Sequence, residues 1–154
     1  MILAYLLRGI HTTSIVSSVI LGLIAAICIA SANYVINEWF DREFDKFHPT
    51  KSQRAAVKTQ LSGTIIFLEW TGLVAIGLAC AFAASKIMLL VACVFALQGV
   101  IYNVPPIRAK DKAYVDVVSE SVNNPLRLMI GWAMVDPTTL PPSSIILTKC
   151  EGDA

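Results

Sequence analysis

Three oxygen-bearing side chains, Asn37, Asp41 and Asp45, recur at intervals of four residues in the first third of the chain. Because side chains four residues apart share one face of a helix, this spacing stacks the three groups one above another. Two carboxylates and an amide, without a cysteine or histidine among them, suit a hard cation such as Mg²⁺. Mg²⁺ held by few carboxylates keeps positions open for water and substrate phosphates. The pattern therefore predicts a magnesium site in which Asp41 and Asp45 are the catalytic carboxylates.

Basic residues follow this row within the same charged loop, residues 37–58. Lys51 and Arg54 are candidates for binding phosphate, the arginine as a planar fork and the lysine as a point charge. The alternative is a solvated loop whose charges only fix the membrane topology. Topology by itself requires Lys and Arg rather than carboxylates in a helical row, and we therefore favour a metal loop.

A second charged stretch, residues 102–116, begins with a tyrosine and continues with basic residues. These residues are Tyr102, Arg108 and Lys110. Pro105 and Pro106 are expected to end the preceding helix and to turn the chain. By themselves, the residues are consistent with a basic topology loop that carries an interfacial tyrosine.

A further polar row follows, again at four-residue spacing: Asp116, Glu120 and Asn124, with Arg127 close behind. Ionisable groups inside a membrane segment are costly, so Asp116, Glu120 and Arg127 are further candidates for substrate binding. Pro125 is expected to move Asn124 out of the helix. Arg127 could instead pair with Glu120 in a purely structural contact.

The elements that must position these residues are membrane helices. Of the 154 residues, 56% are hydrophobic and only 15% are charged, whereas about a quarter of a soluble domain is charged. Runs with few or no charges reach the roughly 20 residues that a spanning helix needs. They cover residues 15–36, 61–85, 87–104 and, more weakly, 116–135. The prediction is one domain, residues 1–154, forming an all-α polytopic transmembrane helix bundle with about four spanning helices.

Charge and cysteine placement exclude other classes of protein and suggest an orientation. The formal net charge of +1 does not indicate a nucleic-acid partner, and the four cysteines show no C-x-x-C spacing. Lys and Arg concentrate in the two charged loops, which the positive-inside rule places in the cytoplasm. Both loops would then lie on one face of the membrane, where they could form a single site.

The motif N-x-x-x-D-x-x-x-D followed by H-P-T-K-x-x-R, at the end of a membrane helix, resembles the UbiA superfamily of intramembrane prenyltransferases. The resemblance implies that Asn37, Asp41 and Asp45 bind Mg²⁺ on an isoprenyl diphosphate, with Lys51 and Arg54 near the diphosphate. It also identifies the stretch after residue 102 with the second cytoplasmic element of the family, and implies a diphosphate-binding role for three residues: Tyr102, Arg108 and Lys110.

The activity that this resemblance implies is Mg²⁺-dependent transfer of a prenyl group, at the membrane, to an aromatic or lipid-like acceptor. Transfer of phosphoribose to a polyprenyl phosphate, known in the same superfamily, is an alternative, and a non-catalytic transporter or scaffold fragment is another. Family members have one more helix before the first motif and a second Asp-rich loop after it. We therefore expect a truncated bundle, roughly the first half, whose partner would be a missing C-terminal half or a second subunit.

Overall fold

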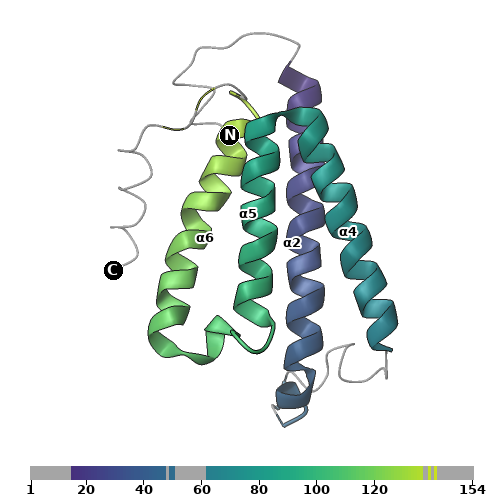
Figure 1. Cartoon of the computed structure of the whole chain (residues 1–154), viewed down its shortest axis with the longest axis vertical. Helices are drawn as coiled ribbons and strands as arrows, with labels where there is room; N and C mark the ends of the chain where they lie inside the picture. The colour runs from purple at the N-terminus through teal and green to yellow at the C-terminus, as the bar shows by residue number, and fades with distance from the viewer. Residues whose placement is uncertain (1–14, 48, 51–61, 137–138, 140, 142–154) are drawn as a thin grey trace.

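The computed structural model describes residues 15–47, 49–50, 62–136, 139 and 141, and these form a helical bundle (Figure 1). Its elements are α2 (Ile15–Asp45), α4 (Gly63–Ala84), α5 (Lys86–Asn103), the short 3₁₀ helix η2 (Ala109–Asp111) and α6 (Ala113–Ala133). No strand occurs in this described part of the chain. The all-α prediction is confirmed.

Successive helices run in opposite directions, so both charged stretches reach the same end of the bundle. In Figure 1, α2 and α5 point downward while α4 and α6 return upward. α4 packs against α2 and α5, and α6 packs against α5. The C-terminal ends of α2 and α5 therefore lie beside the N-terminal ends of α4 and α6. We call this end of the bundle the motif end, because the Asn/Asp row and the Tyr/basic loop are both there.

Three helices, α2, α4 and α5, are long and apolar enough to cross a membrane. The 31 residues of α2 extend over about 46 Å at 1.5 Å per residue, well beyond a hydrocarbon core of roughly 30 Å. Its last turns, which carry the Asn/Asp row, can therefore project past the core. The predicted fourth segment forms α6. Its 21 residues are long enough to cross a membrane, but its ionisable residues make it less apolar than the other three helices.

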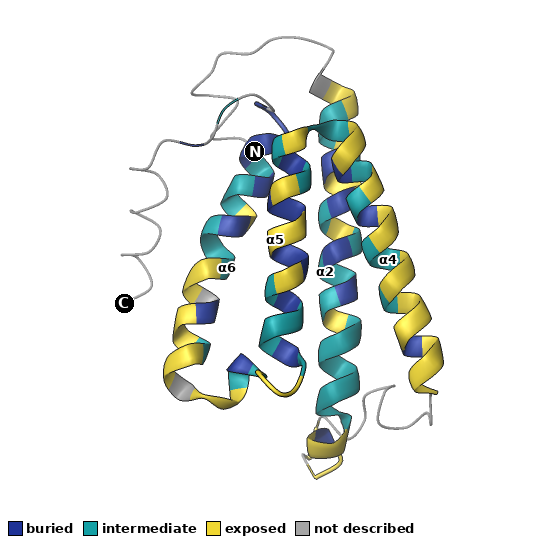
Figure 2. Ribbon diagram, viewed as in Figure 1, coloured by how far each residue is buried: buried dark blue, intermediate teal, exposed yellow. Residues whose placement is uncertain are grey.

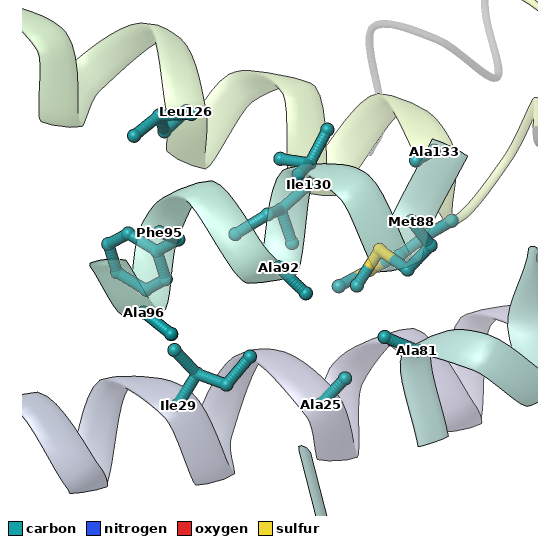
Figure 3. Packing of buried hydrophobic residues seen from close by; sticks show 12 residues of the cluster. Ala25, Ile29, Ala81, Met88, Ala92, Phe95, Ala96, Leu126, Ile130 and Ala133 are labelled. Carbon is teal, nitrogen blue, oxygen red and sulfur yellow. The ribbon is translucent and has the colours of Figure 1, made fainter. Parts of the chain in front are cut away.

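Small and medium-sized apolar residues form the core between the helices. Figure 3 shows Ala25 and Ile29 of α2 facing Ala92 and Phe95 of α5, with Ile130 of α6 on the other side. Alanines at such contacts allow membrane helices to approach closely. By contrast, much of α4 is exposed on its outer side in Figure 2, as expected for a surface that faces lipid.

The two predictions based on prolines have different outcomes. α5 ends at Asn103, before Pro105 and Pro106, as predicted. α6, however, continues through Pro125, so the expectation that Asn124 leaves the helix is wrong. Membrane helices tolerate an internal proline because neighbouring helices and hydroxyl side chains can satisfy the freed backbone groups.

Gly77 lies where α4 packs closely against α2. A Cβ atom at this position would lie 2.8 Å from Ile29 Cγ1 and 3.3 Å from the Ala25 carbonyl oxygen. We expect Gly77→Ala to destabilise the protein by about 1–3 kcal/mol through overpacking. The melting temperature of the detergent-purified protein measures this effect.

Gly72→Ala is the matched control, because a Cβ at position 72 meets nothing within 4 Å. Here the better helix propensity of alanine should stabilise the protein by up to about 1 kcal/mol. Equal melting temperatures for the two variants would contradict the tight contact between α2 and α4.

Candidate functional site

Lys110 of η2 joins the Asn/Asp row of α2 at the motif end. Its Nζ donates to Asp41 Oδ1 at 2.6 Å, to Asn37 Oδ1 at 2.9 Å and to Asn103 Oδ1 at 3.1 Å. Only 12% of the lysine side chain is exposed. The ammonium group therefore occupies the point where three side-chain oxygens converge.

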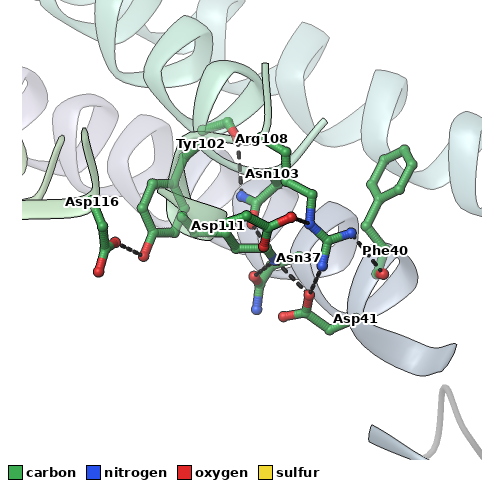
Figure 4. A network of polar contacts seen from close by, with 10 residues as sticks. Asn37, Phe40, Asp41, Tyr102, Asn103, Arg108, Asp111 and Asp116 are labelled. Atoms are coloured by element: carbon green, nitrogen blue, oxygen red, sulfur yellow. Dashed lines mark hydrogen bonds and ion pairs between the residues drawn. The ribbon is translucent and has the colours of Figure 1, made fainter. Parts of the chain in front are cut away.

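Arg108 approaches Asp41 alongside Lys110. Its Nη2 donates to Asp41 Oδ1 at 3.0 Å and its Nη1 to the Phe40 carbonyl oxygen at 3.3 Å, while Nε lies 2.8 Å from Asp111 Oδ2 (Figure 4). The backbone of Arg108 has φ 34°, in the left-handed region that non-glycine residues rarely adopt. Because such a conformation costs free energy, it persists only where the surroundings enforce it. These contacts fix the arginine against Asp41.

Tyr102 connects α5 to α6 at the same end. Its hydroxyl donates to Asp116 Oδ1 at 2.7 Å (Figure 4). One turn nearer the middle of the bundle, Gln98 Nε2 donates to the Ser119 carbonyl oxygen at 3.2 Å. Asp116 therefore orients the tyrosine ring, and the two hydrogen bonds hold α6 in register with α5.

A cavity of about 370 Å³ opens beside these groups; we call it the polar cavity. It extends along α2 from Ala30 to Asp41, with Phe95 of α5 and Arg127 of α6 among its walls. Amide side chains are prominent in its lining: Asn33, Asn37, Gln98, Asn103 and Asn123. The cavity thus combines a charged mouth with a wall rich in hydrogen-bonding groups.

Most of the predicted site residues that the structure describes meet at this cavity. Those that line it are Asn37, Asp41, Tyr102, Lys110 and Arg127. Arg108 reaches the same cluster through its contact with Asp41, although it is not part of the lining. Two motifs about 70 residues apart in the sequence thus build one site.

The other predicted residues lie elsewhere. Asp45 is buried, one turn beyond Asp41, and is not among the described residues that line the polar cavity. Asp116 lies behind Tyr102 and contacts its hydroxyl. Lys51 and Arg54 fall outside the described residues, and so does the side chain of Glu120.

The sequence analysis missed Asn33, which lines the cavity one turn before Asn37. Its Nδ2 donates to the Phe95 carbonyl oxygen at 3.2 Å, and its Oδ1 is buried without a hydrogen-bond partner among the described residues. Gly99 faces it, and a Cβ at position 99 would overlap the amide. The signal was available, because Asn33 extends the four-residue row of Asn37, Asp41 and Asp45 backward by one turn.

The donor set at the mouth fits a hard cation. Among the described residues, no group of three or more His, Cys, Asp or Glu converges on one point. Asn37 and Asp41 nevertheless direct oxygens at the same ammonium group, so both could reach one cation in its place. An amide and a carboxylate, with water and substrate phosphate completing the shell, suit Mg²⁺.

The chain forms antiparallel helices of membrane length, and Asn37 and Asp41 line a polar cavity at the motif end. These features define a multi-pass membrane protein with a site at that end. The sequence model of the UbiA prenyltransferase family matches residues 1–148. The chain belongs to this family, which confirms the resemblance of its motifs.

A solved structure supports the fold independently. The structure of a UbiA homologue from Archaeoglobus fulgidus bound to DMAPP and Mg²⁺ matches with a TM-score of 0.76 and 22% sequence identity. The match covers 87% of this chain and 48% of that chain, so this chain spans about half the length of that homologue. A comparison with curated proteins found no match.

Proposed function

We propose that the protein binds an isoprenyl diphosphate together with Mg²⁺ and transfers its prenyl group to an aromatic or lipid-like acceptor. The observation that carries this proposal is the convergence of Asn37 and Asp41 with Lys110 and Arg108 at the mouth of a cavity. Family membership and the DMAPP and Mg²⁺ bound by the Archaeoglobus homologue support it. The motif end would face the cytoplasm, as the basic loops suggest.

The charged residues would divide the work of binding the diphosphate. Asn37 and Asp41 would hold the cation, with Asp45 as a further ligand from the next turn. When bound, Mg²⁺ neutralises negative charge on the diphosphate as the allylic C–O bond breaks. Lys110, released from the oxygens of Asn37 and Asp41, would donate to the diphosphate, and Arg108 would keep Asp41 in position.

The cavity wall would protect the reacting prenyl group. Phe95 and Tyr102 supply aromatic rings, which exclude water and can stabilise a developing allylic cation. Asp116 would position Tyr102 through the hydroxyl. Arg127 would contact substrate from α6, while Lys51, Arg54 and Glu120 remain proposed substrate contacts.

Calorimetric binding of an isoprenyl diphosphate to the detergent-purified chain, with Mg²⁺ or with EDTA, tests this function. We expect binding in Mg²⁺ and none in EDTA. Phosphoribosyl diphosphate is the competing donor, and tighter Mg²⁺-dependent binding of that compound would favour phosphoribosyl transfer. If neither donor showed Mg²⁺-dependent binding, even after a C-terminal half from the family is added, the proposal would be overturned. That result would favour a transporter or scaffold.

A further inference from the structure

Asn103, the neighbour of Tyr102 in the chain, is a buried polar residue of the polar cavity. It is the last residue of α5 and only 3% exposed, and it lines the cavity beside Lys110. A buried amide is costly unless its donor and acceptor groups find hydrogen-bond partners. The partners of Asn103 therefore indicate what this residue does.

Two hydrogen bonds fix the orientation of this amide. Its Nδ2 donates to the Gly99 carbonyl oxygen at 2.9 Å, and its Oδ1 accepts from Lys110 Nζ at 3.1 Å. A carbonyl oxygen can only accept a hydrogen bond, and an ammonium group can only donate one. The amide therefore cannot turn over without losing both bonds, and its oxygen stays directed at the lysine.

Asn103 differs from the other two side-chain acceptors of Lys110 because it is not a proposed metal ligand. Asn37 and Asp41 contact the lysine from α2, whereas Asn103 contacts it from the end of α5. A cation bound by the α2 row would take two of the three oxygens and leave the third. Lys110, whose side chain is 12% exposed, would keep this partner, and a buried ammonium without any partner would be strongly destabilising.

We propose that Asn103 is a positioning residue for Lys110. It retains the ammonium group at the mouth of the polar cavity when Asn37 and Asp41 bind Mg²⁺, and it presents this group to the diphosphate. A lysine side chain has several rotatable bonds, so fixing it before the substrate arrives reduces the entropy lost on binding. The inference rests on the proposed function and adds to it a residue that acts through the lysine.

A double-mutant cycle tests this role, with calorimetric titration of DMAPP in saturating Mg²⁺. Asn103→Leu replaces the amide by a side chain with the same number of heavy atoms and no acceptor, and should weaken binding about fivefold. Lys110→Met alone should weaken binding about tenfold. Adding Asn103→Leu to Lys110→Met should change the affinity by less than about twofold, because an effect that acts through the lysine disappears with it.

Gln98→Met is the matched control on the same helix. Gln98 also lines the polar cavity and donates to a backbone carbonyl oxygen, that of Ser119, but Lys110 is not among its described partners. Any factor by which Gln98→Met changes the affinity should recur unchanged in Lys110→Met, as for independent sites. Melting temperatures show which variants fold. If Asn103→Leu does not fold, Asn103→Ala, with its smaller side chain, takes its place in the cycle.

Different results would overturn this inference and the proposed function. Independent losses, about fiftyfold in the double variant, or an unchanged affinity in Asn103→Leu would show that Asn103 does not act through the lysine. The same non-additivity in Gln98→Met would attribute the coupling to the cavity wall as a whole. If the wild type bound no DMAPP in Mg²⁺, the proposed function would fail, and the positioning role would fail with it.

Discussion

Asp41→Asn is expected to abolish the Mg²⁺-dependent binding of isoprenyl diphosphate, with a loss of affinity of roughly 100-fold or more. Asp41 is the one carboxylate among the described residues that line the polar cavity. Asparagine preserves the shape of the side chain and removes its charge, so the loss isolates the electrostatic contribution. Calorimetry with and without EDTA measures it.

The same substitution should also lower the melting temperature. It leaves Lys110, whose side chain is 12% exposed, without a carboxylate partner among the described residues, and an unpaired buried charge is strongly destabilising. Binding must therefore be measured well below the melting temperature of the variant.

Glu43→Gln provides the control on the same helix. Glu43 is 62% exposed and pairs with Lys46 at 2.7 Å on the surface, where ion pairs contribute little. Its loss should leave diphosphate binding within about twofold of the wild type. Retained Mg²⁺-dependent binding in Asp41→Asn would contradict the assignment of Asp41, and equal losses in both variants would indicate a general effect of charge.

The helices could be predicted closely because their length and composition are set by the membrane. The charge-poor runs 61–85 and 87–104 became α4, Gly63–Ala84, and α5, Lys86–Asn103. The four-residue row indicated correctly that α2 continues as a helix through Asp45. Pro125 was misjudged because a rule for isolated helices was applied where neighbouring helices can compensate.

Only those features of the site that depend on residue spacing within one segment could be predicted from the sequence. The sequence places the Asn/Asp row and the Tyr/basic loop at one end, but not the hydrogen bond from Lys110 to Asn37, 73 residues away. Spacing could have identified Asn33, which continues the row by one turn, but not its hydrogen bond to the Phe95 carbonyl oxygen or the space that Gly99 provides. Such contacts depend on the packing of α2 against α5, which spacing within one helix does not reveal.

Lys110→Met is expected to change the affinities for metal and substrate in opposite directions. The ammonium group now occupies the place of a cation beside Asn37 Oδ1 and Asp41 Oδ1. Its removal eliminates an internal competitor, so Mg²⁺ alone should bind about three- to tenfold more tightly. The diphosphate loses a charged donor, and its affinity in saturating Mg²⁺ should fall about tenfold.

Lys112→Met removes the same charge from an exposed position of the same loop, and both affinities should stay within about twofold of the wild type. Calorimetric titration of each variant, first with Mg²⁺ and then with isoprenyl diphosphate in saturating Mg²⁺, separates the two effects. If both affinities fell together in Lys110→Met, the lysine would hold the metal ligands in place rather than compete for them. Opposite changes would identify Lys110 as the group that the metal displaces toward the diphosphate. Loss of a purely structural lysine would not raise the affinity for Mg²⁺ while it lowers the affinity for the diphosphate.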